Sequence, residues 1–274
     1  MSFNTTAAEQ ERQLQQDFRQ KLKLERGMRV DLTRELLELN RQFVTQYTRT
    51  GRVLNVLEFH TDFVALFKRH YRRTKRVFGN QIRRNLAEQK SCRETKQLQE
   101  DIETAQNLYI AQESNSRSQA TLITVDRQLR QSVVFAEQQI IEEQQEEEIP
   151  LFFLLGVPTA AVAAIAGNKF KSLIPAKSSF IASLAIQDGA EEMKLIEAEI
   201  MEQRGAIQNS NKQWQALLDE RTRLSHASAD GQVVGLRENF IVQGQSLSRP
   251  GDLSHGATMD NIANCRCSSL VIIP

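Results

Sequence analysis

Residues 230–244 read DGQVVGLRENFIVQG, and they form a stretch of turns and strand-like runs in a chain that is otherwise rich in helix formers. Asp230-Gly231 is a turn signal, since glycine accepts the backbone angles that tight turns require. Val233-Val234 and Phe240-Ile241-Val242 are β-branched or aromatic, and Gly244 closes the second run. Short runs of this kind between turn residues are typical of strands. We therefore expect short antiparallel strands here.

The flanking residues extend this pattern in both directions. Trp214, the single tryptophan, lies in a short strand or a helical turn, and Pro250-Gly251-Asp252 forms a further turn. Residues 269–273 read SLVII and alternate too little for a half-exposed strand, so we expect a paired strand that is covered on both faces. With one or two helices, these elements predict a compact domain over residues 206–274.

The sequence before Pro150, which is the first proline, has a helical composition. Gln, Glu, Arg, Leu and Lys are frequent there, and glycine occurs only at Gly27, Gly51 and Gly79. Good helix formers without breakers predict long helices. Apolar residues spaced three, four and seven apart indicate one amphipathic helix, which we expect to bend near residues 79–80. These residues are Phe63, Leu66, Phe67, Tyr71, Val77, Phe78, Ile82 and Leu86.

A second periodic stretch runs through Leu98, Ile102 and Tyr109 to Val133. Together the two stretches predict three or four helices over residues 7–148, packed as an elongated bundle or arm. The fold class is therefore α+β, with a long helical region followed by a small mixed domain. We expect three consecutive parts: residues 1–148, residues 149–205 with an apolar segment and connecting helices, and residues 206–274.

The apolar segment, residues 151–167, reads LFFLLGVPTAAVAAIAG and carries no charge. A membrane span needs about 20 apolar residues, and this run is short and contains Gly156 and Pro158. We favour a buried helix pair broken at residues 156–158, or a packing surface against another subunit, over a membrane span. Residues 176–204 are again helical in pattern, with an expected break at Asp188-Gly189.

The composition of the whole chain sets further bounds. Its 274 residues are 40% hydrophobic, and its formal charge is +1, so the molecule as a whole has no strong attraction to nucleic acid or anionic lipid. Three cysteines give an odd count, and the chain does not open with a basic stretch followed by an apolar one. Synthesis in a reducing cytoplasm is the simplest expectation.

Local charge is concentrated between Lys68 and Lys96, where eleven basic residues meet only Glu88 and Glu94. Such a stripe can neutralise DNA phosphates in a salt-dependent way, it can face an acidic partner protein, or it can be a solvated helix face. Base stacking is not expected, because Phe67 and Tyr71 fall on the side that should be buried. The candidate binding residues are Arg69, Arg72, Arg73, Lys75, Arg76, Arg83 and Arg84.

Two cysteines form a C-x-C pair at Cys265 and Cys267. If both lie on extended backbone, their thiols point to the same side. With His226, and with His255 or Asp230 as a further ligand, they would supply the sulfur and nitrogen atoms that tetrahedral zinc prefers. The alternatives are a thiol pair buried as small apolar groups, or a disulfide, which residues two apart would strain.

Charged residues cluster just before this pair in sequence. Asp219, Arg221, Arg223, His226 and Asp230 offer both signs of charge and an imidazole. They could form a catalytic site, with His226 as general base and the arginines holding an anion, or a set of salt bridges that fixes a small domain. We favour the structural interpretation and assign no catalytic residue.

As an ordered set, these motifs resemble the C-terminal signature of phage head morphogenesis proteins, the family of the phage Mu F-like minor head proteins. The resemblance covers residues 211–273, through the motifs DERTR, SH, DGQ, PGD and NCRC, and residues 67–82 loosely. The signature residues are Trp214, Asp219, Arg221, Arg223, Asp230, Gly231, Asp252 and Asn264.

This resemblance implies a minor structural protein of a tailed phage or prophage, present in the virion head near the portal after synthesis in the host cytoplasm. It implies portal, coat or scaffold protein as partners, contact with packaged DNA, and an oligomeric state in the particle. Two alternatives remain. The apolar segment suits a membrane-active ejection protein, and the His/Cys/Arg cluster, in a family whose relatives include toxin fusions, suits a metal-dependent or ADP-ribosyl-transferring enzyme.

Overall fold

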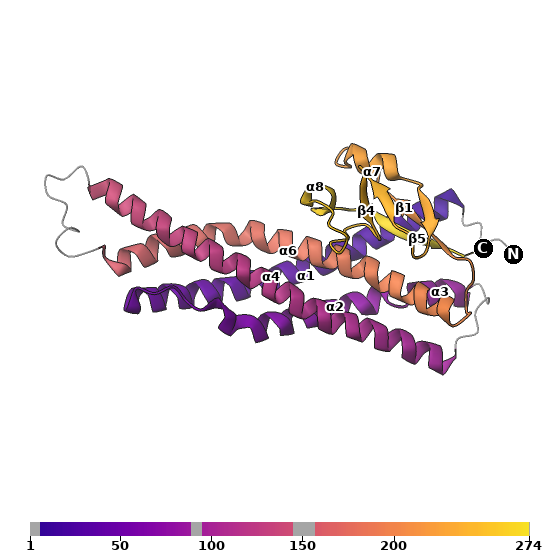
Figure 1. Cartoon of the computed structure of the whole chain (residues 1–274), viewed down its shortest axis with the longest axis horizontal. Coiled ribbons are helices and arrows are strands. Elements are labelled where there is room, and N and C mark those ends of the chain that lie inside the picture. Colours follow the sequence, from indigo (N-terminus) through magenta and orange to yellow (C-terminus); the bar gives the residue numbers. More distant parts are fainter. Residues whose placement is uncertain (1–5, 89–94, 145–156, 274) are drawn as a thin grey trace. The chain divides into compact units, whose positions relative to one another are not determined.

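The computed structural model describes residues 6–88, 95–144 and 157–273, and its helices make up most of the described chain (Figure 1). The long elements are α1 (Ala7–Thr50), α2 (His60–Phe78), α4 (Lys96–Gln144) and α6 (Thr159–Gln203). Shorter ones are the 3-10 helix η1 (Val56–Phe59), α3 (Gln81–Glu88), α7 (Leu224–Ala229) and α8 (Met259–Ile262). The α+β class and the helices expected before residue 148 are confirmed.

The amphipathic stretch from Phe63 to Leu86 forms two helices, α2 and α3, which meet at the predicted bend. Gly79 makes the bend possible, because a Cβ there would lie 2.6 Å from the Lys75 carbonyl oxygen. The start of α3 is held by Glu197 of α6, whose carboxylate accepts the N–H groups of Ile82 (2.9 Å) and Arg83 (3.1 Å). A carboxylate at a helix N-terminus satisfies N–H groups that have no partner within the helix.

The break expected at Asp188-Gly189 is wrong, since α6 continues through both residues. Gly189 faces the ring of Tyr71, and a Cβ at this position would lie 2.7 Å from Cε1 of that ring. The glycine thus permits close packing of a helix against an aromatic side chain. Asp188 is buried, and its carboxylate binds Arg249 (2.7 Å) and Tyr109 (3.1 Å). Tertiary contacts therefore override the local turn signal.

Gly189→Ala is expected to lower the free energy of unfolding by about 1–3 kcal/mol, because the added methyl group overpacks against Tyr71. In an open helix the same change should stabilise by up to about 1 kcal/mol. Gly27→Ala in α1 is the matched control, since the nearest atom to its Cβ would be an Arg73 side-chain nitrogen 4.0 Å away. Urea titrations of both variants should give shifts of opposite sign; equal shifts would refute the packing argument.

The strands follow α6. In a three-stranded antiparallel sheet of order β2-β1-β5, β1 (Asn211–Gln215) is central, with β2 (Val233–Gly235) and β5 (Ser268–Ile272) on either side. A separate hairpin joins β3 (Phe240–Val242) to β4 (Gln245–Leu247). Its turn residues Gln243 and Gly244 both have positive φ (52° and 72°), as the tight turns of two-residue hairpins require. The expected antiparallel strands are confirmed.

Two compact units can be distinguished. Unit 1 comprises residues 1–28, 68–113 and 182–274, and unit 2 comprises residues 29–67 and 114–181. Within unit 2, Tyr47 of α1 donates a hydrogen bond to Glu137 of α4 (3.3 Å), and Thr159 at the start of α6 donates to the Thr48 carbonyl (3.1 Å). Compact units are not consecutive domains, so the predicted division into residues 1–148, 149–205 and 206–274 stays a prediction.

Within unit 1, residues 211–273, here called the C-terminal segment, have two apolar cores. Trp214 lies in one, beside Phe240 and both cysteines of the C-x-C pair. Leu236 belongs to the other, which also includes Ile82 and Leu86 of α3, Ile102 of α4 and Met201 of α6. The second core packs this segment against the helices of its own unit.

Part of the apolar segment, residues 151–156, lies outside the described residues, and α6 begins at Thr159. Over the residues that the structure does describe, no helix is both long enough and apolar enough to cross a membrane. The membrane-active ejection protein stays a prediction.

Candidate metal centre

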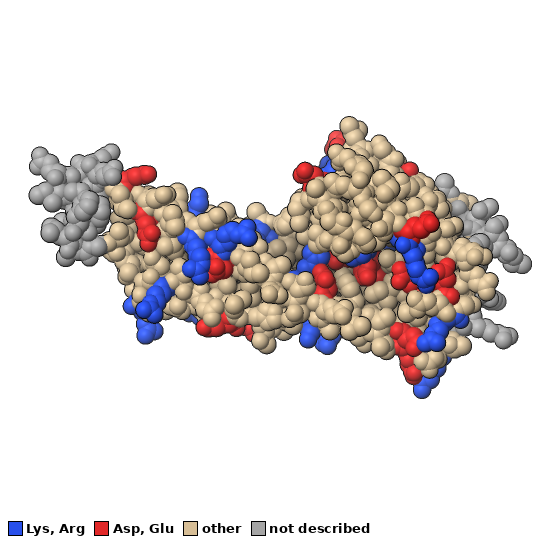
Figure 2. All heavy atoms as spheres, viewed as in Figure 1, with Lys and Arg blue, Asp and Glu red and all other residues tan. Residues whose placement is uncertain are grey.

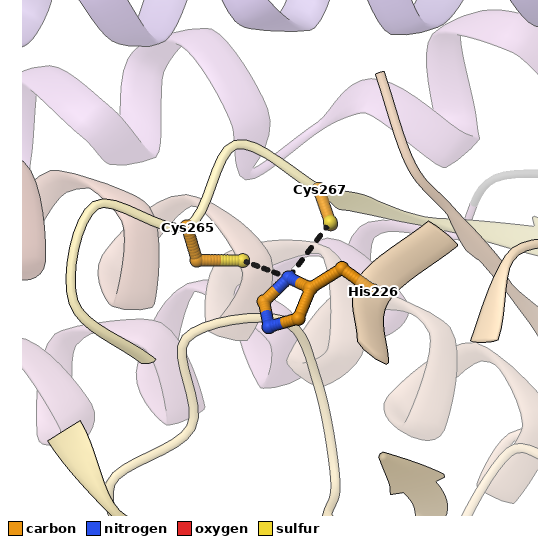
Figure 3. A group of neighbouring side chains, drawn as sticks. All are labelled: His226, Cys265 and Cys267. Atoms are coloured by element: carbon orange, nitrogen blue, oxygen red, sulfur yellow. Dashed lines mark hydrogen bonds between the residues drawn. The ribbon is translucent and has the colours of Figure 1, made fainter. Parts of the chain in front are cut away.

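Two thiols and one imidazole meet inside the C-terminal segment (Figure 3). Nδ1 of His226 lies 3.3 Å from Sγ of Cys267 and 3.7 Å from Sγ of Cys265. One ligand atom from each of the three residues can be chosen so that all lie within 4.8 Å of one another, and all three residues are buried. The predicted metal-ligand candidates are therefore brought together.

Local backbone geometry explains this arrangement. Asn264 has a positive φ of 53° and turns the chain after α8 into the extended run that leads into β5. Alternate side chains of extended backbone point to opposite sides. Accordingly, Cys265 and Cys267 are buried, whereas Arg266 between them forms an ion pair with the exposed Asp219. His226 comes from the short helix α7.

The two thiols affect each other's pKa. The Cys267 thiol donates a hydrogen bond that lowers the pKa of Cys265 well below its usual value, and His226 adds to this effect. The same interaction, together with burial, raises the pKa of Cys267 well above its usual value. Two adjacent buried thiolates would repel each other, so ionisation of one thiol opposes ionisation of the other.

The surroundings hold the group firmly. The ring of Trp214 stands edge-on to His226 at 5.6 Å and to Phe240 at 5.4 Å. The carbonyl oxygen of Cys267 accepts hydrogen bonds from Lys21 of α1 (3.2 Å) and Gln187 of α6 (2.8 Å). These contacts order the backbone that carries the ligand before any ion binds.

The signature residues near His226 do not converge on one site. Asp219 pairs with Arg266, Arg223 donates to the Ala263 carbonyl, and Asp230 accepts the Ala216 N–H (2.7 Å). Arg221 is exposed. Asp219, Arg223 and Asp230 therefore have separate partners, and of these three only Asp219 forms a salt bridge among the described residues.

The remaining signature residues shape turns. Gly231 and Gly251 have positive φ (77° and 84°). Asp252 is fully buried and accepts the N–H groups of Ser248 (2.8 Å) and Ser254 (2.7 Å). His255 binds this carboxylate at 2.6 Å, and among the described residues neither His255 nor Asp230 belongs to the metal-ligand group.

The candidate basic residues are divided between surface and core. Arg69, Arg72, Arg73, Arg76 and Arg84 are exposed, and Lys75 is half-buried, donating to Asn107 (2.9 Å). Arg83 is buried, and its Nε binds Glu197 at 3.1 Å, so its assignment to a surface stripe is wrong. Lys90 and Arg93 lie outside the described residues. On the face in Figure 2, basic and acidic side chains alternate, and the strand-bearing part is mostly uncharged.

Comparisons with known proteins add two partial similarities. Over 73 residues the chain is 38% identical to the minor head protein GP7 of Bacillus phage SPP1, covering 26% of this chain and 23% of GP7. Over 65 residues it is 32% identical to the NAD(+)-arginine ADP-ribosyltransferase EFV of Enterococcus faecalis, covering 24% of this chain and 13% of the enzyme. The chain thus matches less than a quarter of the length of either relative.

No protein-family model matches the chain, and no solved structure is similar to it. A quarter of the chain resembles a phage head protein. The inferred relation to phage head proteins is thereby supported at that level, while the narrower Mu F-like assignment stays a prediction.

Unit 1 also contains a buried charge cluster that the sequence patterns did not predict. Glu191 of α6 lies 2.5 Å from Nζ of Lys21 and 2.9 Å from Nζ of Lys194, and Lys194 also meets Asp17 at 3.3 Å. Glu191 also accepts the Ser269 N–H of β5 at 2.8 Å. We call Asp17, Lys21, Glu191 and Lys194 the ion cluster. It ties β5 to α1 and α6.

A sequence signal for this cluster exists in the spacing of its residues. Asp17 and Lys21 follow the buried Leu14 at intervals of three and seven, and Lys194 precedes the buried Ala198 by four. Charged residues at core positions of a helix are rarely buried unless they are paired. The sequence contains this spacing, but it does not show that Lys21 pairs with Glu191 or that Lys194 pairs with Asp17, since these partners are 170 and 177 residues apart.

Proposed function

We propose that this protein is a noncatalytic structural component of a tailed-phage head, acting in head assembly at or near the portal. The similarity to a phage minor head protein carries the proposal. The signature residues support it, because they take part in turns, ion pairs and core packing. In a catalytic site they would instead need to converge on one point. The similarity spans a quarter of the chain and concerns a minor head protein, so the position at the portal is part of the proposal and needs its own test.

The attachment of the C-terminal segment to α6 suits a structural role. Arg249 binds Asp188 at 2.7 Å and Glu192 at 2.9 Å, and the ion cluster holds β5 to the same helix α6. Buried ion pairs add geometric specificity to a contact, because each charge tolerates few alternative positions. A segment fixed in this way can present a defined surface to an assembly partner.

Deleting the gene from the phage or prophage that carries it tests the role in assembly. We expect fewer DNA-filled heads by electron microscopy, restored when the full chain is supplied in trans, and we expect the protein in purified heads by mass spectrometry. Co-sedimentation of the purified chain with portal rings at low salt tests the position. Normal, infectious particles without the protein would overturn the proposal.

Contact with packaged DNA is part of the proposal and rests on one exposed face of α2. Arg69, Arg72, Arg73 and Arg76 are spaced three, four and seven apart and therefore share a helix face. Arg72→Glu/Arg76→Glu should weaken DNA retention and reduce the slope of log affinity against log salt by about 0.9 for each lost phosphate contact. The matched control is Arg41→Glu/Arg130→Glu, which changes the charge equally at two exposed arginines elsewhere. If both double variants weakened DNA retention equally, the arginine face of α2 would be solvated surface without a specific role in DNA binding.

The similarity to an ADP-ribosyltransferase favours one second candidate, transfer of ADP-ribose to arginine. Incubating the full chain with labelled NAD(+) and an arginine-rich acceptor protein discriminates the two candidates. We expect no label on the acceptor. Label that depends on the chain would replace the structural proposal with an enzymatic one.

A further inference from the structure

We propose that His226, Cys265 and Cys267, here called the triad, bind a structural zinc ion that links two parts of the core of the C-terminal segment. The ligand atoms are Nδ1 of the imidazole and the two Sγ atoms, which face one another in Figure 3. Such an ion would stabilise the fold of this segment whether or not the chain acts in phage assembly.

The distances fit a tetrahedral ion. With zinc–sulfur bonds of about 2.3 Å and zinc–nitrogen bonds of about 2.0–2.1 Å, tetrahedral geometry separates nitrogen from sulfur by about 3.6 Å. The distances from Nδ1 to the two sulfur atoms are 3.3 Å and 3.7 Å, which bracket this value. The three ligand atoms all lie within 4.8 Å of one another, which is compatible with one ion between them.

The charge balance also favours an ion. Two thiolates and a neutral imidazole around Zn²⁺ make a group with no net charge, which is far less costly to bury than an isolated thiolate. Zinc binding requires both thiols to be deprotonated, so uptake of the ion releases protons to solvent. The chemical softness of the ligands also favours zinc, since thiolate and imidazole bind zinc in preference to magnesium or calcium.

The coordination is incomplete with protein ligands alone. Within the described part of the chain, the metal-ligand group contains these three residues, and we assign the fourth position of the tetrahedron to water as part of the proposal. The competing explanation is a triad held only by hydrogen bonds among thiols and imidazole. The two explanations differ in whether the chain takes up metal.

The position of the triad gives the ion a mechanical role. Both cysteines belong to the nine-residue buried core around Trp214. An ion would link α7 to the run before β5, two parts of this core that are 39 residues apart. Small cores are often reinforced by a metal, because their apolar area alone stabilises them little.

Metal uptake by the untagged full chain tests the proposal. We expect about one equivalent of zinc after purification without chelator, and, after chelator treatment, a thiolate-to-cobalt charge-transfer band on titration with Co²⁺ that Zn²⁺ abolishes. Cys265→Ser and Cys267→Ser should each weaken Co²⁺ binding more than about 100-fold, since loss of a direct ligand exceeds the 10–100-fold effect of its supporting contacts.

Matched controls separate the triad from other thiols and imidazoles. Cys92→Ser removes the third cysteine and His255→Gln removes a histidine bound to Asp252, and both variants should keep the full equivalent. Trp214 fluorescence checks that each variant is folded. Added Zn²⁺ should raise the unfolding midpoint of the wild type and of the two control variants, but not that of Cys265→Ser or Cys267→Ser. Absence of the cobalt band in the folded wild-type chain, or undiminished binding by Cys265→Ser, overturns the proposal.

Discussion

Glu191→Ala is expected to lower the free energy of unfolding by about 3–5 kcal/mol, because it leaves buried ammonium groups without their counter-charge. Glu191 is fully buried, and side chains of Lys21 and Lys194 are only 7% and 4% exposed. Lys194 retains Asp17 at 3.3 Å, whereas the partner that Lys21 retains among the described residues is the Cys267 carbonyl at 3.2 Å. The substitution also frees the Ser269 N–H at the edge of β5.

Urea denaturation followed by Trp214 fluorescence measures this loss without screening the ion pairs, as guanidinium chloride would. Glu38→Gln is the control, since Glu38 pairs with Arg41 on an exposed helix face and its removal should change stability little. If Glu191→Ala cost less than about 1 kcal/mol, the ion cluster would behave like a surface pair reached by water.

The same cluster makes stability depend on pH. Burial alone raises the pKa of Glu191, but the ammonium groups of Lys194 and Lys21 outweigh it and lower the pKa from 4.5 to about 2. A carboxyl whose pKa is lower in the folded state contributes stability above its unfolded pKa and loses it as the pH falls. The stability difference between wild type and Glu191→Ala should therefore be full above pH 4.5 and shrink toward pH 2. A constant difference would contradict the assignment.

Features set by neighbouring residues could be predicted from the sequence. The bend at Gly79, the turns at Gly231 and Gly244, and the strand character of residues 240–242 all follow from local backbone preferences. The pairing of β1 with β5 could not, because it joins Asn211 to Ile272 through contacts that no short window contains. Gly189 shows the same limit, since only the Tyr71 ring distinguishes a packing glycine from a turn glycine.

The candidate site divides in the same way. The chemistry of two thiols and an imidazole indicated His226, Cys265 and Cys267, although only the fold shows that their ligand atoms meet. Charge alone misled at Arg83, where a residue of a basic stripe turned out to neutralise the buried Glu197. Which charged side chains are buried depends on partners that are distant in sequence, and a charge pattern read along one helix does not contain them.

Trp214→Ala should produce the second large loss, about 3–5 kcal/mol, through the cavity left by the largest fully buried side chain of the described residues. Trp214 is 0% exposed and lies in a core of nine buried residues, edge-on to both His226 and Phe240. A core of this size cannot redistribute its packing around the cavity. We therefore expect the strands to unfold locally before the long helices do.

Hydrogen exchange measured by mass spectrometry separates these two events. Peptides from β1 and β5 should exchange faster in Trp214→Ala, while peptides from α4 keep their protection. Leu224→Ala is the control, since this residue of α7 is 86% exposed and its truncation leaves the core intact. If the zinc site is present, added Zn²⁺ should slow exchange in β5 of the Trp214→Ala chain, because His226 and both thiols remain to bind it. Uniformly faster exchange across strands and helices would instead mean that the core around Trp214 stabilises the whole unit as one cooperative structure.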